Sequence, residues 1–245
     1  MNIDKSFRDG VLRLAIRVED ARNALDFPTV AELRTALADA RKRDDVGVLI
    51  LESGLKRVFS LGMNLTKLEA EAETGVWTGF AHIADYAELL IDIATMPMPT
   101  VAVIDGIAAG GGVELACVCD VLIGTNNASF SIAQLRKGIF PFITSAVVVP
   151  RIGQSRFLHW ALSGQTLPAK RLFDLGLINQ LCDASERDRT VSIFAERVLS
   201  FDAQTLRAGV GFLRTESEGE VRTRIRHAHA LFALNCLARR EGPPA

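Results

Sequence analysis

Apolar residues in the first half of the chain gather in short runs that predict β-strands. The runs at 46–51 (VGVLIL) and 100–104 (TVAVI) are continuous and rich in β-branched residues, which is typical of strands buried on both faces. At 11–18 (VLRLAIRV), apolar and polar residues alternate well enough to predict a strand with one wetter face. A further short apolar run predicts a strand at 121–124.

Segments with helical spacing separate these strands. Apolar residues at intervals of three and four predict a helix over 29–43. The segment 66–94 is also predicted to be largely helical, and it should end before the sequence MPMP at 96–99, because proline cannot continue a helix. A short helix is predicted at 111–119. Strands separated by helices need crossover connections, so the predicted fold class is α/β.

Helical spacing dominates the chain beyond Gly153. It predicts helices at 154–163, 168–175, 185–200, 203–214 and 219–240, interrupted by a predicted strand at 177–182. We therefore divide the chain into a core at 1–184 and a C-terminal helical region at 185–245.

Charge and composition narrow the class of partner. The chain has 28 Lys and Arg against 29 Asp and Glu, a formal net charge of −1, and no basic stripe. Neither nucleic acid nor an anionic membrane is therefore expected as a partner.

No apolar stretch approaches the ~20 residues needed to cross a bilayer, and the N-terminus lacks the apolar region of a signal peptide. Four scattered cysteines are too few for a disulfide framework, so we expect a cytoplasmic protein with free thiols.

The most informative stretch is a glycine-rich turn that follows a buried strand. Gly110, Gly111 and Gly112 open a predicted helix. The first N–H groups of a helix have no partner within it and can donate to an anion, and glycine lets a ligand approach the main chain closely. Glu114 follows Gly111 by about one helical turn and can point toward the same side. The turn therefore predicts a carboxylate beside an anion-binding amide, while close helix–sheet packing is the other use of such glycines.

The stretch 105–120 (DGIAAGGGVELACVCD) closely resembles the signature of the enoyl-CoA hydratase/isomerase (crotonase) family. Other blocks agree in order and spacing, namely 22–25 (RNAL), 59–65 (FSLGMNL), 129–131 (SFS), 138–139 (GI), 150–153 (PRIG), 162–164 (LSG) and 175–179 (LGLIN). The resemblance implies a crotonase-like ββα spiral core that contains the thioester site, followed by a C-terminal helical trimerisation region.

The resemblance also implies where a substrate binds. In this family a thioester carbonyl lies between two backbone N–H donors, and the matching positions here are Met63 and Gly111. Such donors stabilise the negative charge that develops on the oxygen as the substrate becomes an enolate. The further residues expected at the substrate site are Leu61, Gly62, Gly110 and Phe140, with coenzyme A contacts from Arg22, whose guanidinium suits phosphate, and from the backbone around Ala24.

The family's hydratases use two glutamates, and this chain matches only the first. Glu114 occupies the first position, whereas Gln134 occupies the second. An amide can orient water or a thioester but cannot transfer a proton at neutral pH. We therefore expect an enoyl-CoA isomerase or hydratase-like enzyme in which Glu114 is the single acid/base. Two alternatives stay open, a thioester decarboxylase of the methylmalonyl-CoA decarboxylase type and a catalytically attenuated thioester-binding member.

Three other polar residues lie on a segment that borders the acyl pocket in relatives. His82, Asp85 and Tyr86 each have a side chain that could be a second proton donor. A solvated helix face explains the three together more simply, and this is the interpretation that the sequence favours.

Partners and cofactors follow from the same resemblance. Coenzyme A is expected as part of the substrate, no separate cofactor is expected, and no Cys/His/Asp cluster has the spacing of a metal site. Family members commonly continue into a C-terminal segment whose lysine reaches the adenine, whereas this chain ends in ARREGPPA at 238–245. The acyl group is therefore expected on coenzyme A or on the phosphopantetheine of a carrier protein. A homotrimer or a dimer of trimers is the expected assembly.

Overall fold

A six-stranded sheet forms the centre of the computed structural model, which describes residues 2–64 and 76–240. In sheet order its strands are β1 (Ile3–Arg8), β2 (Val11–Ile16), β4 (Val48–Ser53), β7 (Thr100–Ile104), β9 (Val121–Thr125) and β12 (Gln180–Cys182). The β1–β2 hairpin is antiparallel and every other pair in this sheet is parallel. The predicted strands at 11–18, 46–51, 100–104 and 121–124 all lie in this sheet.

Two smaller sheets lie beside the large one. The four-stranded sheet has the order β11 (Leu167–Pro168), β10 (Ser129–Ser131), β8 (Gly106–Ala109) and β5 (Arg57–Ser60), and the two-stranded sheet pairs β3 (Ala24–Leu25) with β6 (Gly62–Met63). β8 starts two residues after β7 ends, so the chain passes directly from one sheet into the other. This passage brings the glycine-rich turn to the junction of the sheets.

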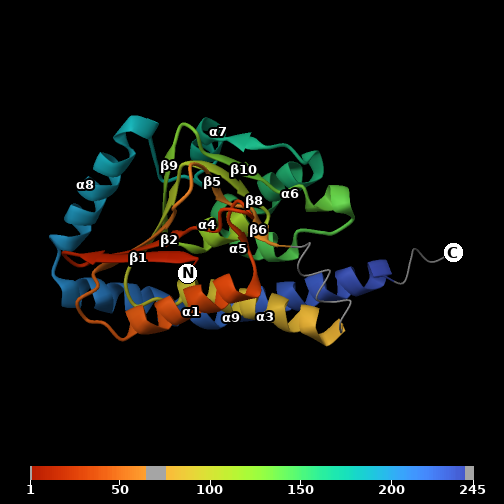
Figure 1. Cartoon of the computed structure of the whole chain (residues 1–245), viewed down its shortest axis with the longest axis horizontal. Helices are drawn as coiled ribbons and strands as arrows, with labels where there is room; N and C mark the ends of the chain where they lie inside the picture. The colour runs from red at the N-terminus through yellow and green to blue at the C-terminus, as the bar shows by residue number, and fades with distance from the viewer. Residues whose placement is uncertain (1, 65–75, 241–245) are drawn as a thin grey trace.

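Helices cover both sides of the six-stranded sheet. They are α1 (Phe27–Arg41), α3 (Val76–Ala94), α4 (Gly111–Val118), α5 (Phe142–Ile152), α6 (Gln154–Ser163), α7 (Ala169–Asp174), α8 (Arg187–Leu199) and α9 (Ala203–Arg240), with short 3₁₀ turns η1 (Gln134–Lys137) and η2 (Ala184–Glu186). α1, α3 and α9 lie side by side along one side of the molecule, and α8 packs on the other face of the sheet (Figure 1).

The strands predicted to be buried on both faces have this arrangement. In β4, Leu49 and Leu51 join the main core toward α1 and α3, whereas Val48 and Ile50 join a second cluster under α8. Neighbouring side chains of a strand point to opposite faces, so a continuous apolar run is what a sheet covered on both sides requires.

The C-terminal region differs from its prediction in one respect. The separate helices predicted at 203–214 and 219–240 form one helix, α9, that runs through Gly219. Glycine weakens a helix by only about 1 kcal/mol relative to alanine, and packing of α9 against α3 and α5 outweighs that cost.

The apolar segment that forms α5 was not predicted as a helix, because its continuous apolar residues and Pro150 hide the helical period. The part of the predicted 66–94 helix that precedes residue 76 lies outside the described residues.

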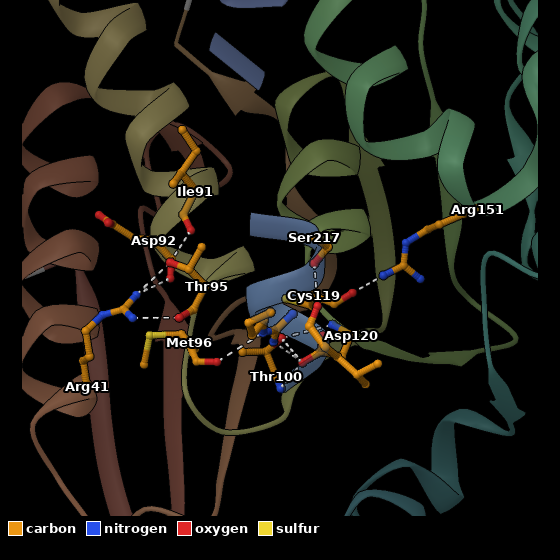
Figure 2. A network of polar contacts seen from close by, with 12 residues as sticks. Arg41, Ile91, Asp92, Thr95, Met96, Thr100, Cys119, Asp120, Arg151 and Ser217 are labelled. Carbon is orange, nitrogen blue, oxygen red and sulfur yellow. Dashed lines mark hydrogen bonds and ion pairs between the residues drawn. The ribbon is translucent and has the colours of Figure 1, made fainter. Parts of the chain in front are cut away.

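A polar network joins α9 to the core near the start of β7 (Figure 2). One carboxylate oxygen of Asp120 accepts hydrogen bonds from the backbone N–H and hydroxyl of Thr100, at 2.8 and 2.9 Å, and from Arg214 of α9 at 2.8 Å. Beside it, Arg41 of α1 donates to the carbonyl oxygen of Thr95 at 2.7 Å, near the end of α3. The network therefore holds three helices near the start of β7, an interior strand of the sheet.

Among the described residues, no helix is both long and apolar enough to span a bilayer.

Candidate active site

A cavity of about 200 Å³ opens where the glycine-rich turn, α3, α5 and α9 meet. Its apolar lining consists of Leu61, Met63, Ile83, Ile139, Ile143 and Phe232, together with the alanines at 109 and 133. Its polar lining consists of Tyr86, Glu114, Ser131 and Gln134, and the backbone of Gly110 and Gly111 completes it. An apolar cavity with a few convergent polar groups is the usual form of a small-molecule site.

The two backbone segments predicted to hold the donors lie against each other. Gly62 has φ +79°, and a Cβ built on it would overlap the amide nitrogen of Gly111. Only glycine therefore allows this contact between β6 and the start of α4. Gly111 is the first residue of α4, so its N–H has no acceptor within the helix.

The direction of the Met63 amide follows from the strand geometry. The N–H of Asn64 donates to the carbonyl oxygen of Leu25 in β3 at 2.8 Å. Successive N–H groups of a strand point to opposite sides, so the N–H of Met63 points away from β3. The structure thus brings Met63 and Gly111 together at one cavity.

A buried asparagine holds the loop that precedes Met63. The Asn23 side chain donates to the carbonyl oxygens of Ile16 at 2.9 Å and Phe59 at 3.0 Å. Its backbone carbonyl accepts from Ser60, whose hydroxyl oxygen in turn accepts from the N–H of Gly62 at 3.0 Å. Sequence reasoning placed Asn23 in a substrate-contacting segment, whereas its side chain fixes the turn.

Glu114 lies in the cavity wall on α4, and its side chain has few polar neighbours. The residue is 6% exposed, and one carboxylate oxygen accepts from the hydroxyl of Thr144 on α5 at 2.6 Å. Burial raises the pKa of Glu114 from 4.5 to about 7, and the hydrogen bond from Thr144 limits the rise. A carboxyl group with that pKa exchanges protons readily at neutral pH.

Tyr86 is a site residue that sequence reasoning undervalued. The residue is 1% exposed, its hydroxyl donates to the carbonyl oxygen of Gly111 at 2.6 Å, and it lines the cavity. Burial and the nearby Glu114 carboxylate hold the pKa of Tyr86 well above its ordinary value of 10.0. The interpretation of a solvated helix face is therefore wrong for Tyr86. It fits Asp85, which pairs with Arg34 at 3.0 Å, while the His82 side chain lies outside the described part of the chain.

Gln134 on η1 lines the cavity and contacts Thr144. Its amide nitrogen donates to the Thr144 hydroxyl oxygen at 3.3 Å, and its amide oxygen is buried without a hydrogen-bond partner. Thr144, which no sequence motif indicated, is fully buried between Gln134 and Glu114. Side chains from three separate elements therefore meet at Thr144.

The remaining predicted residues lie around this centre. Ala24 pairs with Gly62 across the β3–β6 sheet, and the Arg22 side chain is exposed just before it. Phe140 packs its ring against Phe142, with centroids 4.9 Å apart, and its N–H donates to the side chain of Asn235 on α9 at 3.1 Å. Leu61 and Gly110 line the cavity directly, whereas Phe140 is not a lining residue and follows Ile139, which is one.

No group of three His, Cys, Asp or Glu within residues 2–64 and 76–240 is arranged to hold a metal ion. Cys117 and Cys119 are buried, and burial raises the pKa of the Cys117 thiol to about 12. Neither of these cysteines lines the cavity.

Comparison with known proteins adds three findings. The family model for enoyl-CoA hydratase/isomerase matches residues 6–233. The human protein "Enoyl-CoA hydratase domain-containing protein 2, mitochondrial" is 33% identical over 180 residues, which cover 72% of this chain and 60% of that protein. The 4-chlorobenzoyl coenzyme A dehalogenase-2 of Arthrobacter sp is 29% identical over 199 residues, covering 80% of this chain and 72% of the relative.

Solved structures show the same fold. The crystal structure of enoyl-CoA hydratase from Bacillus halodurans superposes with a TM-score of 0.91 at 21% identity, covering 96% of this chain and 95% of that one. An enoyl-CoA hydratase from Mycobacterium avium subsp. paratuberculosis is 25% identical, with a TM-score of 0.81 and coverage of 98% and 96%. The match to the human relative spans only about three fifths of that protein's length, so this chain corresponds to part of it.

Proposed function

The chain belongs to the enoyl-CoA hydratase/isomerase family, and from this premise we propose that it is an enzyme that converts an acyl thioester through an enolate held by Met63 and Gly111. The predicted crotonase-like α/β fold with a C-terminal helical region is confirmed by its structural neighbours. The family acts on thioesters, and we propose below which thioester reaction this chain catalyses.

The observation that supports the proposal best is the placement of Glu114. Its carboxyl group is buried in the same cavity wall as the Gly111 amide, with a pKa of about 7. A carbonyl oxygen bound by the two amides would place its acidic α-carbon in this cavity. The amides would stabilise the enolate oxygen, and such a donor typically contributes about 3–4 kcal/mol to the transition state.

Isomerisation of an enoyl thioester fits a single acid/base without a further reactant. Glu114 takes a proton from the α-carbon, electrons move onto the thioester oxygen, and the same carboxylic acid returns the proton to the γ-carbon as the double bond shifts. Gln134 cannot exchange protons at neutral pH, so Glu114 serves both steps. Met63, Leu61 and Ile143 form apolar walls suited to an acyl chain.

Hydration is the second candidate, because one observation favours it. The Gln134 side chain lines the same cavity as Glu114, and an amide there can orient a water molecule by hydrogen bonds. Decarboxylation has less support. A carboxylated acyl group would put a second anion beside Glu114, and the lining residues that the structure describes include no Lys, Arg or His to offset it.

We expect the thioester on coenzyme A, with Arg22 near its phosphates, and a carrier-protein phosphopantetheine is the alternative. The homotrimer or dimer of trimers expected from the family stays a prediction that sedimentation velocity can test. Comparing kcat/KM for the same acyl group on coenzyme A and on a carrier protein distinguishes the two donors.

The test uses 2-enoyl, 3-enoyl and malonyl-type coenzyme A thioesters with the products identified by mass spectrometry and NMR. Isomerisation keeps the mass and moves the double bond, hydration adds water, and decarboxylation releases CO₂. Glu114→Gln should lower kcat by about 10²–10⁴-fold and leave thioester binding largely intact. Full turnover by this variant would contradict the role of Glu114. No conversion of any thioester that the protein binds would favour the thioester-binding alternative.

A further inference from the structure

The hydrogen bonds behind Glu114 form a chain with a definite direction. Gln134 donates from its amide nitrogen to the Thr144 hydroxyl oxygen at 3.3 Å, and Thr144 donates its hydroxyl proton to Glu114 at 2.6 Å. Thr144 is fully buried, and Glu114 is 6% exposed. The three residues come from η1, α5 and α4, so tertiary packing alone brings them together.

This direction matches an ionised Glu114. A carboxylate has no proton to donate, so the Thr144 hydroxyl must donate to it, and the hydroxyl oxygen is then free to accept from Gln134. The Gln134 amide oxygen is the group that this arrangement leaves without a partner. A buried unpaired acceptor is costly, at about 1–3 kcal/mol, so it indicates a state of the site in which that oxygen is used.

A protonated Glu114 would reverse the chain. Its O–H would donate to the Thr144 oxygen, and Thr144 could then donate its own proton to an acceptor. The Gln134 amide oxygen becomes that acceptor if the amide turns by half a rotation, since oxygen and NH₂ exchange places in an amide group. In each of these hydrogen bonds the donor and the acceptor have then exchanged places.

We infer that Thr144 couples the protonation of Glu114 to the orientation of the Gln134 amide, which makes Thr144 a positioning residue of this site. Glu114 in its ionised form leaves the Gln134 oxygen as the unpaired atom, whereas protonated Glu114 leaves the NH₂ group unpaired. The residue that replaces the second glutamate thus offers an acceptor before proton abstraction and a donor after it. This inference rests on the proposed acid/base role of Glu114.

Few other ionisable groups face Glu114. Tyr86 on α3 donates to the carbonyl oxygen of Gly111, and its raised pKa keeps it protonated at neutral pH. Cys117 is one turn further along α4 and its thiol is neutral for the same reason. Arg151 on α5 donates hydrogen bonds to the carbonyl oxygens of Cys117 and Cys119. Glu114 is therefore the group in this neighbourhood that titrates near pH 7.

NMR titration of the ligand-free protein tests the coupling without any substrate. Glutamate labelled with ¹³C at the side-chain carboxyl reports Glu114, which the Glu114→Gln variant assigns. The chain has five glutamines, so selective ¹⁵N labelling gives a simple side-chain amide spectrum, in which Gln134→Met assigns Gln134. In the unaltered protein the Gln134 amide resonances should shift with the same midpoint as Glu114.

Two variants of Thr144 make the test specific. Thr144→Val removes the hydroxyl at nearly constant volume, so the Glu114 midpoint should rise by about one pH unit and the Gln134 response should fall by more than half. Thr144→Ser keeps the hydroxyl and should preserve both the midpoint and the response. Where a substrate is known, the midpoint of the acid limb of the pH–kcat profile should likewise rise in Thr144→Val and stay unchanged in Thr144→Ser.

A Gln134 amide that stays constant while Glu114 titrates in the unaltered protein would overturn the inference, even if Thr144→Val failed to fold. So would a full Gln134 response in a folded Thr144→Val variant. The proposed function fails separately, because a protein that shows the coupling but converts no thioester would keep the inference and lose the enzyme assignment.

Discussion

Glu114 makes the stability of the folded chain depend on pH. Its pKa is raised from 4.5 to about 7, so between these values the folded protein binds a proton that the unfolded chain has released. The free energy of unfolding therefore falls as pH rises through this window, and the loss amounts to roughly 3 kcal/mol once pH exceeds 7. Glu114→Gln should remove this dependence and exceed the unaltered protein in stability at alkaline pH. Urea denaturation of both proteins on either side of the window measures the difference. If the free energy of unfolding changed with pH equally in both proteins, the result would contradict the burial of an ionised Glu114.

Individual site residues were predictable where backbone spacing fixes them. Gly111 and Glu114 lie one helical turn apart in the sequence, and the structure keeps both at the cavity. Tyr86 and Thr144 were not, because each reaches the site through the packing of a whole helix. Tyr86 is next to the charged Asp85, and only the rotation of α3 against α4 shows that its side chain points inward.

At the scale of elements, the site depends on a close contact between β6 and the first turn of α4. Elements with one clear period were predicted well, and β7 has the bounds expected from its apolar run. The two-residue strands β3 and β6 were not predicted, because so short a segment has no period. Their pairing positions Met63 beside Gly111, so this feature of the site depended on the family resemblance.

Gly62→Ala should disrupt that contact, and Gly176→Ala is a matched control. Both glycines have φ +79°, but a Cβ would overlap Gly111 at the first position and meets nothing within 4 Å at the second. Left-handed backbone strain of about 1–2 kcal/mol should appear in both variants, and the overlap should add about 1–3 kcal/mol in Gly62→Ala alone. Thioester turnover should fall only in that variant. Chemical denaturation and steady-state kinetics measure the two effects, and equal losses in both variants would show that the close approach is unimportant.

At the scale of the whole molecule, the cavity joins distant parts of the chain. Its lining begins at Leu61 and ends at Phe232, so the site is complete only when α9 has packed against α3 and α5. Asn235 of the same helix accepts a hydrogen bond from the N–H of Phe140 at 3.1 Å and so holds the neighbouring wall. The C-terminal region, predicted at 185–245 as an oligomerisation region, therefore also supplies part of the site, while its division from the core at residue 184 stays a prediction.

Phe232 allows this contribution of α9 to be measured. Phe232→Ala removes one apolar wall of the cavity, and losing a partly buried ring should weaken binding of the acyl group about equally in the ground and transition states. We expect KM to rise about tenfold, which corresponds to about 1.4 kcal/mol, with little change in kcat or in the pH of half-maximal activity. Leu234→Ala is the control, since Leu234 lies on the same helix and is 61% exposed. Steady-state kinetics across a pH series measures these values. If both variants changed KM equally, α9 would act through general stability; if Phe232→Ala instead shifted the pH profile, the helix would help to set the ionisation of Glu114.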